Sequence, residues 1–303
     1  MLLSWAVTIP DNATRVDRET RGLALGFVGV ACFSASLPFT LVAVREFGVI
    51  FPSFGRAVIA AVLAAIALGI TRTPLPRRGL WGRLYMAVGG VAVGFPAFTG
   101  LALQHAPSGH GAVVIGLLPA ATAGWSVLRT GSRPSMRFWM FAAVGAGAIV
   151  ALAIAEGTAA VALGDLYLLG AIASGATGYT EGAVVSREIG GWQTISWIVI
   201  FALPITVPVT LIGLGPVGFD EPWTAWLGLA YIGAVSMFFG FFAWYAGLAL
   251  GGIARVSQIQ LLQPMMSLVW ASIFLHEQLD LLIVVVALVV LASVAGSKRS
   301  AID

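Results

Sequence analysis

The sequence predicts an all-α polytopic membrane protein with ten transmembrane helices, arranged as two inverted five-helix repeats. Of its 303 residues, 59% are hydrophobic and only 10% are charged, whereas soluble domains average about 45–50% apolar and about 25% charged residues. Apolar runs of about 18 or more residues also recur from Gly22 to Gly296, and a helix needs about 20 such residues to cross the hydrocarbon core. Many spans are therefore expected, rather than one anchor.

The expected spans are separated by short linkers. Linkers such as Thr73–Pro76 and Gly131–Pro134 contain proline or glycine, which do not continue a helix smoothly, and none is long enough for a soluble domain. The predicted spans are 22–44, 49–70, 84–104, 109–128, 138–156, 165–186, 195–214, 223–248, 256–275 and 280–296.

The ends of the chain are expected to be short tails. Residues Met1–Pro10 are apolar but lack the basic segment that begins a signal peptide, so no cleaved signal is expected. The charged residues Asp11–Arg21 then lead into the first span. The chain divides into a cytoplasmic N-terminal tail (1–21), a first five-helix repeat (22–156), a second five-helix repeat (157–296) and a cytoplasmic C-terminal tail (297–303).

The distribution of charge predicts the orientation, because Lys and Arg near the ends of spans stay on the cytoplasmic side. With the N-terminus inside, all of the 16 Lys and Arg residues except Arg45 and Arg56 lie on the cytoplasmic side. The outer loops collect acidic residues instead. We therefore expect both termini to be cytoplasmic, in a bacterial-type inner (plasma) membrane. The net charge of +3 then reflects this orientation and not binding to nucleic acid.

Two similar motifs indicate the internal repeat. Gly100-Leu-Ala-Leu103 precedes Pro119, and Gly247-Leu-Ala-Leu250 precedes Pro264. Because each repeat holds an odd number of spans, the second must be inverted relative to the first. In carriers built from inverted repeats, the substrate site lies near the bilayer midplane at the interface between the repeats.

Together these features resemble the drug/metabolite transporter superfamily, in particular the ten-helix exporters built from two EamA-type repeats. The resemblance covers 22–296 and rests on the length, the ten spans, and Pro52, Arg56, Pro119, Pro264 and the pair His276-Glu277. Family members often carry a Glu after the fourth helix, where this chain instead reads Arg129-Thr-Gly-Ser-Arg-Pro134. The resemblance implies a secondary transporter that exports small metabolites, and the pattern is similar to that of bacterial amino-acid exporters, including the aromatic amino-acid branch.

The predicted substrate site combines amides with aromatic rings. Gln260, Gln263 and Ser267 share one helix face, and unpaired amides destabilise a span, so this face should point at a cavity or at another helix. Amides could then bond an ammonium and a carboxylate while rings hold an apolar side chain, which favours apolar and aromatic amino acids. The expected substrate-binding residues are Gln260, Gln263, Tyr179, Trp244, Tyr245, Phe95 and Phe98.

Two charges lie inside spans, where they need compensation. Arg56 is interpreted either as a structural anchor or as a gating or substrate-carboxylate contact. Glu181 is interpreted as an inner gate charge or proton site, or as a partner of Arg187 and interfacial water. From their distances to the helix ends, direct pairing of Arg56 with Glu181 is not expected.

Small residues and prolines indicate where helices pack closely or bend. Gly170, Ser174, Gly178 and Gly182 form a four-residue stripe that lets another helix approach, as a static contact or as a sliding surface. Three prolines are expected to bend their helices around the cavity: Pro96, Pro119 and Pro264.

No motif indicates catalysis, a metal site or a cofactor. The sequence contains no HExxH, nucleophile elbow or Walker loop, and the lone Cys32 is interpreted as a packing residue. His105 and His110 are interpreted as interfacial surface histidines, with a proton-coupled role as the alternative. The expected partners are the lipid bilayer and a small-molecule substrate. Two other functions stay open: an intramembrane enzyme acting on a lipid or isoprenoid, and a non-transporting subunit of a membrane complex.

Overall fold

The protein is helical throughout the part of the chain that the structure describes. This computed structural model describes residues 15–130, 136–156, 159–218, 220–251, 256–278 and 280–300. Its elements are α1 (Arg15–Ser34), α2 (Ser36–Phe47), α3 (Ile50–Thr71), η1 (Arg78–Leu80), α4 (Trp81–Ala87), η2 (Val88–Gly94), α5 (Phe95–Ala102), α6 (Ser108–Ile115), α7 (Leu118–Thr130), α8 (Met136–Glu156), α9 (Ala159–Ile189), α10 (Gly191–Leu214), α11 (Trp223–Ala230), η3 (Tyr231–Gly240), α12 (Phe241–Gly251), η4 (Ser257–Leu262), α14 (Gln263–Leu275) and α15 (Leu281–Ser300). The predicted all-α class is confirmed.

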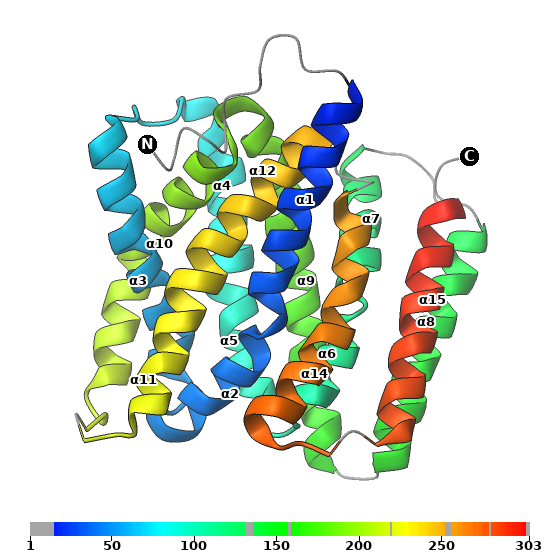
Figure 1. The fold of residues 1–303 in the computed structure, drawn as a ribbon. Helices are drawn as coiled ribbons and strands as arrows, with labels where there is room; N and C mark the ends of the chain where they lie inside the picture. The colour runs from blue at the N-terminus through cyan, green and yellow to red at the C-terminus, as the bar shows by residue number, and fades with distance from the viewer. Residues whose placement is uncertain are drawn as a thin grey trace.

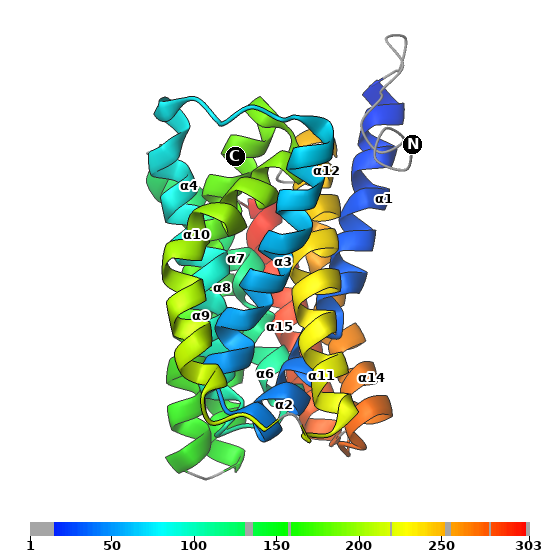
Figure 2. The same cartoon turned by 90° about the vertical axis from the view of Figure 1, so that its left-hand side faces the viewer.

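Consecutive elements join into long segments that run along one common direction (Figure 1, Figure 2). Five helical segments of the described residues are long and apolar enough to cross a membrane: Asp17–Phe47, Ile50–Thr71, Arg78–Ala102, Gly191–Leu214 and Trp223–Gly251. Shorter apolar helices include Gln263–Leu275 and Leu281–Ser293. Large apolar side chains such as Ile70, Leu211 and Ile212 remain exposed, which fits a surface that contacts lipid.

The two halves of the chain run in opposite directions. α1, the first helix of the first half, and α9, the first helix of the second half, begin at opposite ends of the bundle (Figure 1). The last helix, α15, ends at the end where α1 begins. We call this the α1 end; it is the end predicted to be cytoplasmic.

Helix packing repeats between the halves. α3 packs against α10 at one edge of the bundle, and α8 packs against α15 at the opposite edge (Figure 1). α1 packs against η3 and α12, and correspondingly α9 packs against α4, η2 and α5. α6 and α7 pack against α14 and η4, respectively. Exchanging the two five-span halves leaves this pattern unchanged, as expected for two inverted repeats.

Several spans are interrupted at matching places in the two halves. The third and eighth spans carry π-helical segments, η2 and η3. The fourth span breaks between α6 and α7, and the ninth changes from the 3₁₀ helix η4 to α14. Pro96, Pro119 and Pro264 each stand at the start of the α-helix that follows an interruption, because proline fits the first helical turn but cannot donate to the preceding turn.

The first span differs from its prediction in two ways. α1 begins at Arg15 rather than at residue 22, and its first turns expose Asp17 and Arg18, because charged residues can continue a helix beyond the apolar stretch. The span also breaks at Ala35. Pro38 has no N–H for the carbonyl of Ser34, and the Ser267 hydroxyl donates to that carbonyl instead, at 2.6 Å.

Close approach of glycines joins the first and second halves. A Cβ on Gly90 would lie 2.6 Å from the Cα of Gly178. In the matching contact between α1 and α12, a Cβ on Gly22 would lie 2.5 Å from the Cα of Gly251. Only glycine fits at such contacts. In each of the two contacts, a glycine-lined helix of one half therefore packs closely against a helix of the other half.

Candidate functional site

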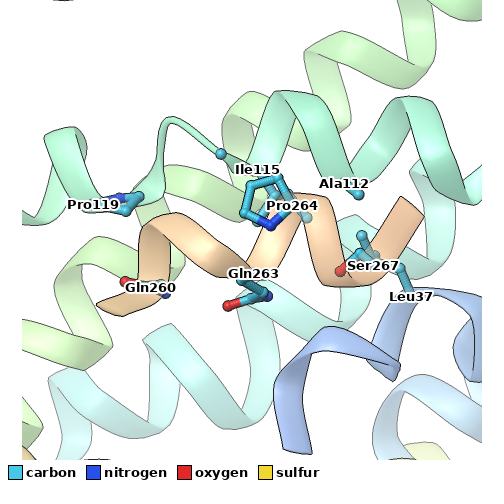
Figure 3. A pocket seen from close by; sticks show the side chains of 9 residues that line it. Leu37, Ala112, Ile115, Pro119, Gln260, Gln263, Pro264 and Ser267 are labelled. Atoms are coloured by element: carbon cyan, nitrogen blue, oxygen red, sulfur yellow. The ribbon is translucent and has the colours of Figure 1, made fainter. Parts of the chain in front are cut away.

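Two adjoining pockets lie where the interrupted spans meet. The larger one, here called the central pocket, has an empty volume of about 470 Å³ and is lined by Phe33, Ser36, Leu37, Thr40, Arg56, Val91, Phe95, Thr99, Ile115, Tyr179, Ser236, Met237, Phe241 and Gln263. The smaller one, the helix-break pocket, measures about 230 Å³ and is lined by Leu37, Ala112, Ile115, Gly116, Pro119, Gln260, Gln263, Pro264 and Ser267 (Figure 3). Leu37, Ile115 and Gln263 border both pockets, so the two form one site.

The helix-break pocket lies between two broken spans. Pro119 and Ile115 belong to the α6–α7 break, and Gln260, Gln263 and Pro264 belong to the facing η4–α14 junction (Figure 3). Pro119 cannot donate to the carbonyl of Ile115, which therefore lacks its usual helical donor. Discontinuous helices of this kind supply polar backbone groups to substrate sites in transporters.

Amide atoms of both glutamines at this junction are buried without a hydrogen-bond partner among the described residues. Gln260 is 3% exposed, and neither its Oε1 nor its Nε2 has a hydrogen-bond partner among the described residues. The Tyr179 hydroxyl is the polar group that neighbours this amide. The Oε1 of Gln263 is also buried and unpaired. Each such group costs about 1–3 kcal/mol, so these are polar atoms that a small molecule or water could satisfy.

A guanidinium stands at the other side of the central pocket. Arg56 on α3 is 4% exposed, and its Nη2 donates to the Ser236 hydroxyl at 3.1 Å. That hydroxyl also shares a hydrogen bond of 2.6 Å with the hydroxyl of Ser36. The contact links the second span to the eighth and first spans. Arg56 therefore sits on a hydroxyl network and does not pair with Glu181.

Aromatic rings form one wall of the central pocket. Phe33 and Phe241 have ring centroids 4.8 Å apart, and Tyr179 lies 5.7 Å from Phe241. Trp244 packs behind them, 5.8 Å from Tyr179 and 1% exposed. These rings supply an apolar surface beside the polar groups of Arg56 and the amides.

The structure brings together only some of the predicted substrate-binding residues. Tyr179, Phe95 and Gln263 line the central pocket, and Gln260 and Gln263 line the helix-break pocket. Three others line neither pocket. Trp244 is a second layer behind Tyr179, Tyr245 donates its hydroxyl to the Gly178 carbonyl at 3.1 Å, and Phe98 packs on Gly170.

Other pocket residues were not predicted from the sequence. Ser36, Thr40, Thr99 and Ser236 contribute hydroxyls, and Phe33 contributes a ring. Ser36 and Thr40 stand four residues apart in a largely apolar span. That spacing places both hydroxyls on one helix face and is a signal that could have identified them.

Charged contacts close the α1 end of the site. The buried carboxylate of Glu181 on α9 accepts from Arg83 on α4 at 2.6 Å. Arg77 pairs with Glu188 at the same end, between exposed side chains. Sequence reasoning placed Arg187 near Glu181, but the cation that bonds it comes from the third span.

At the opposite end of the bundle, polar contacts join the N-terminus of the short helix α6 to neighbouring elements. Glu277 accepts from the backbone N–H groups of Ser108 and Gly109, at 3.1 and 2.9 Å, and from the Ser108 hydroxyl at 2.9 Å. His110 contacts Asp165 on α9 at 2.6 Å. The prediction that His110 is a surface histidine is wrong, because its side chain is fully buried. His105 is partly exposed and stacks on Tyr167.

The predicted small-residue stripe of α9 faces the third and eighth spans. Gly178 lies against Gly90, and Ser174 against Gly94. Gly170 lies against the Phe98 ring and Gly182 against the Tyr245 ring. Whether this contact also slides during transport stays a prediction.

Comparison with known proteins identifies relatives over nearly the whole chain. The EamA-like transporter family matches twice, over residues 20–154 and 162–298. The uncharacterized transporter YdeK of Bacillus subtilis (strain 168) is 44% identical over 292 residues, covering 94% of this chain and 100% of that protein. A solved crystal structure superposes with a TM-score of 0.62 over 93% of this chain and 98% of its own, at 17% identity. At this identity, the last match supports the fold alone.

Proposed function

Because the chain belongs to the EamA-like transporter family, we propose that it is a secondary transporter that exports small amphipathic metabolites, and amino acids in particular. The observation that carries this proposal is the site between the broken spans. The amide of Gln260 and the Oε1 of Gln263, buried without partners among the described residues, stand there beside the rings of Phe33, Tyr179 and Phe241. Sites for small molecules combine apolar walls with a few polar groups in this way.

The ring wall favours apolar and aromatic side chains over charged ones. An amino acid could place its side chain against Phe33 and Phe241, while its polar end meets Arg56 and the amides. Among the described residues that line the two pockets, none is acidic. A cationic side chain would therefore find no carboxylate in the site, so lysine and arginine are expected to be poor substrates.

Alternating access follows from the contacts at the two ends. The pocket lies between the Arg83–Glu181 ion pair at the α1 end and the Glu277 contacts of α6 at the other. We propose that the pocket opens toward one end when the contacts at that end break, while the contacts at the other end stay formed. The α1 end also carries Arg72, Arg77, Arg78 and Arg187, which supports its assignment as cytoplasmic in an inner membrane.

Purified protein in liposomes tests the proposal. We expect counterflow of labelled phenylalanine or leucine that exceeds the flux in protein-free liposomes, with lysine and glutamate transported more slowly. Gln263→Ala should reduce the flux, because its amide borders both pockets. Gln104→Ala is the matched control, since Gln104 is exposed in a linker.

Two results would count against the proposal. If liposomes that contain the wild-type protein transport none of the standard amino acids, the amino-acid assignment is wrong. If Gln263→Ala transports as fast as Gln104→Ala, then the site lies elsewhere in the bundle.

A further inference from the structure

Arg56 is a buried cation for which the described part of the chain supplies no counter-charge. It is 4% exposed on the wall of the central pocket, and its Nε is buried without a hydrogen-bond partner. Its side-chain hydrogen bond goes to the neutral hydroxyl of Ser236, and the Tyr179 ring borders the same pocket. Among the described residues, Arg56 forms no ion pair.

The carboxylates of the neighbouring spans are already engaged. Glu181 bonds Arg83, Asp165 bonds His110, and Glu277 caps α6. These contacts hold the carboxylates at the two ends of the bundle. A guanidinium remains protonated in proteins, and an ion that is desolvated without a partner is strongly unfavourable.

We propose that the carboxylate of the transported molecule is the counter-ion of Arg56. This inference rests on the proposed transport function and names the group that the site recognises. Nη2 donates to the Ser236 hydroxyl, which is itself bonded to the Ser36 hydroxyl, and this contact anchors one edge of the guanidinium. The neighbouring Nε–H is then free to donate to a carboxylate, and an oriented guanidinium matches the geometry of a carboxylate.

The ammonium group of an amino acid has no equivalent partner. The pocket-lining residues in the described part of the chain include no Asp or Glu. An ammonium would meet only neutral acceptors such as the Oε1 atoms of Gln260 and Gln263. An ammonium on neutral oxygens gains charge-assisted hydrogen bonds but meets no opposite charge, whereas a carboxylate beside Arg56 gains both. The site therefore requires a carboxylate and tolerates loss of the amine, so its ligands extend to apolar and aromatic monocarboxylates and exclude cationic amphiphiles.

Three small probes test this inference by binding to the purified protein, which does not depend on transport. Phenylalanine carries both charged groups, 3-phenylpropanoate lacks the amine, and 2-phenylethylamine lacks the carboxylate. We expect 3-phenylpropanoate to bind within about tenfold of phenylalanine, because it gives up only contacts to neutral acceptors. We expect 2-phenylethylamine to bind at least about 100-fold more weakly, because it leaves Arg56 uncompensated.

Variants assign the effect to the guanidinium. Arg56→Gln should abolish the preference for 3-phenylpropanoate over 2-phenylethylamine, and Arg56→Lys should keep the preference at lower affinity, because it keeps the charge but loses the planar donors. Arg45→Gln is the control, since Arg45 is exposed at the end of α2. Size-exclusion chromatography checks folding, and if Arg56→Gln misfolds, the probe series on the wild type and on Arg56→Lys still decides the question.

The outcomes separate this inference from the transport proposal. Equal binding of 2-phenylethylamine and 3-phenylpropanoate to the wild type would overturn the inference, even if phenylalanine is transported. Arg56-dependent binding of 3-phenylpropanoate would support it, even if no amino acid crosses the liposome membrane; in that case the transport proposal alone fails.

Discussion

Arg83 on α4 donates to Glu181 on α9 at 2.6 Å, and the two partners differ sharply in exposure: Glu181 is 0% exposed, whereas Arg83 is 40% exposed. The contact ties the third span to the sixth at the α1 end of the pocket. Arg83 can be solvated by water when the pair is broken, whereas Glu181 cannot. Loss of the arginine is therefore expected to cost more than loss of a partner from an exposed ion pair.

Removal of the cation should therefore be costly. Arg83→Ala deprives a fully buried carboxylate of this partner, and we expect it to lower the stability by roughly 2–3 kcal/mol, somewhat less than the ~3–5 kcal/mol of a wholly buried pair. The thermal unfolding midpoint in detergent measures the effect. Arg77→Ala is the control, because its pair with Glu188 is exposed on both sides and should contribute no more than about 1 kcal/mol. Equal losses in the two variants would show that burial of Glu181 does not matter.

The buried amide of Gln260 is expected to lower the stability of the folded protein and to contribute to transport. Gln260→Leu keeps the volume and removes two unpaired polar atoms, so we expect Tm to rise by about 2–4 °C while flux falls. Gln104→Leu, in an exposed linker, should change neither quantity. A fall in both Tm and flux for Gln260→Leu would mean that the amide is structural.

Neighbouring glycines of η2 give a sharp test of the contact between the halves. Gly90→Ala would place a Cβ 2.6 Å from the Cα of Gly178, whereas a Cβ on Gly89 meets nothing within 4 Å. We expect Gly90→Ala to cost about 1–3 kcal/mol or more through overpacking, with a corresponding loss of flux. Gly89→Ala should unfold close to the wild-type temperature. The prediction is wrong if both variants behave alike.

The orientation is tested by cysteine labelling in a Cys32→Ser background. Gly79 and Gly215 lie at opposite ends of the bundle, and both have room for a side chain. With the α1 end in the cytoplasm, an impermeant maleimide added to intact cells should label Gly215→Cys, and Gly79→Cys only after the membrane is opened. Labelling of both from the same side would contradict the inverted topology.

Composition and hydropathy were sufficient to predict the helical class and the approximate position of most helical segments, because backbone groups in lipid must bond within their own segment. Proline predicted several interruptions for a related reason, since its missing N–H ends the regular ladder at Pro119 and Pro264. The break at Ala35 had the same cause in Pro38 but was overlooked. The π-helical segments η2 and η3 depend on packing between spans, which no local pattern reveals.

The candidate site was predictable where a residue type is costly in a membrane. Arg56, Gln260 and Gln263 stood out for that reason, and all three line a pocket. Aromatic residues gave no such signal, because rings occur in packed interiors as often as on the walls of pockets. Trp244 and Tyr245 were thus expected at the pocket surface, although the structure buries them one layer behind it.

The carboxylate of Glu277 on the N-terminus of α6 bears on how the two halves diverged. In a head-to-tail duplication of an odd-numbered unit, equivalent loops face opposite compartments. Selection for basic residues on the cytoplasmic side then acts on one copy of each loop and not on the other. The loop that follows α14 keeps its acid, whereas the equivalent stretch in the first half reads Arg129-Thr-Gly-Ser-Arg-Pro134. Likeness between the halves should therefore persist at uncharged positions, as in Gly100–Leu103 and Gly247–Leu250, and fade first where the charge of a loop is selected.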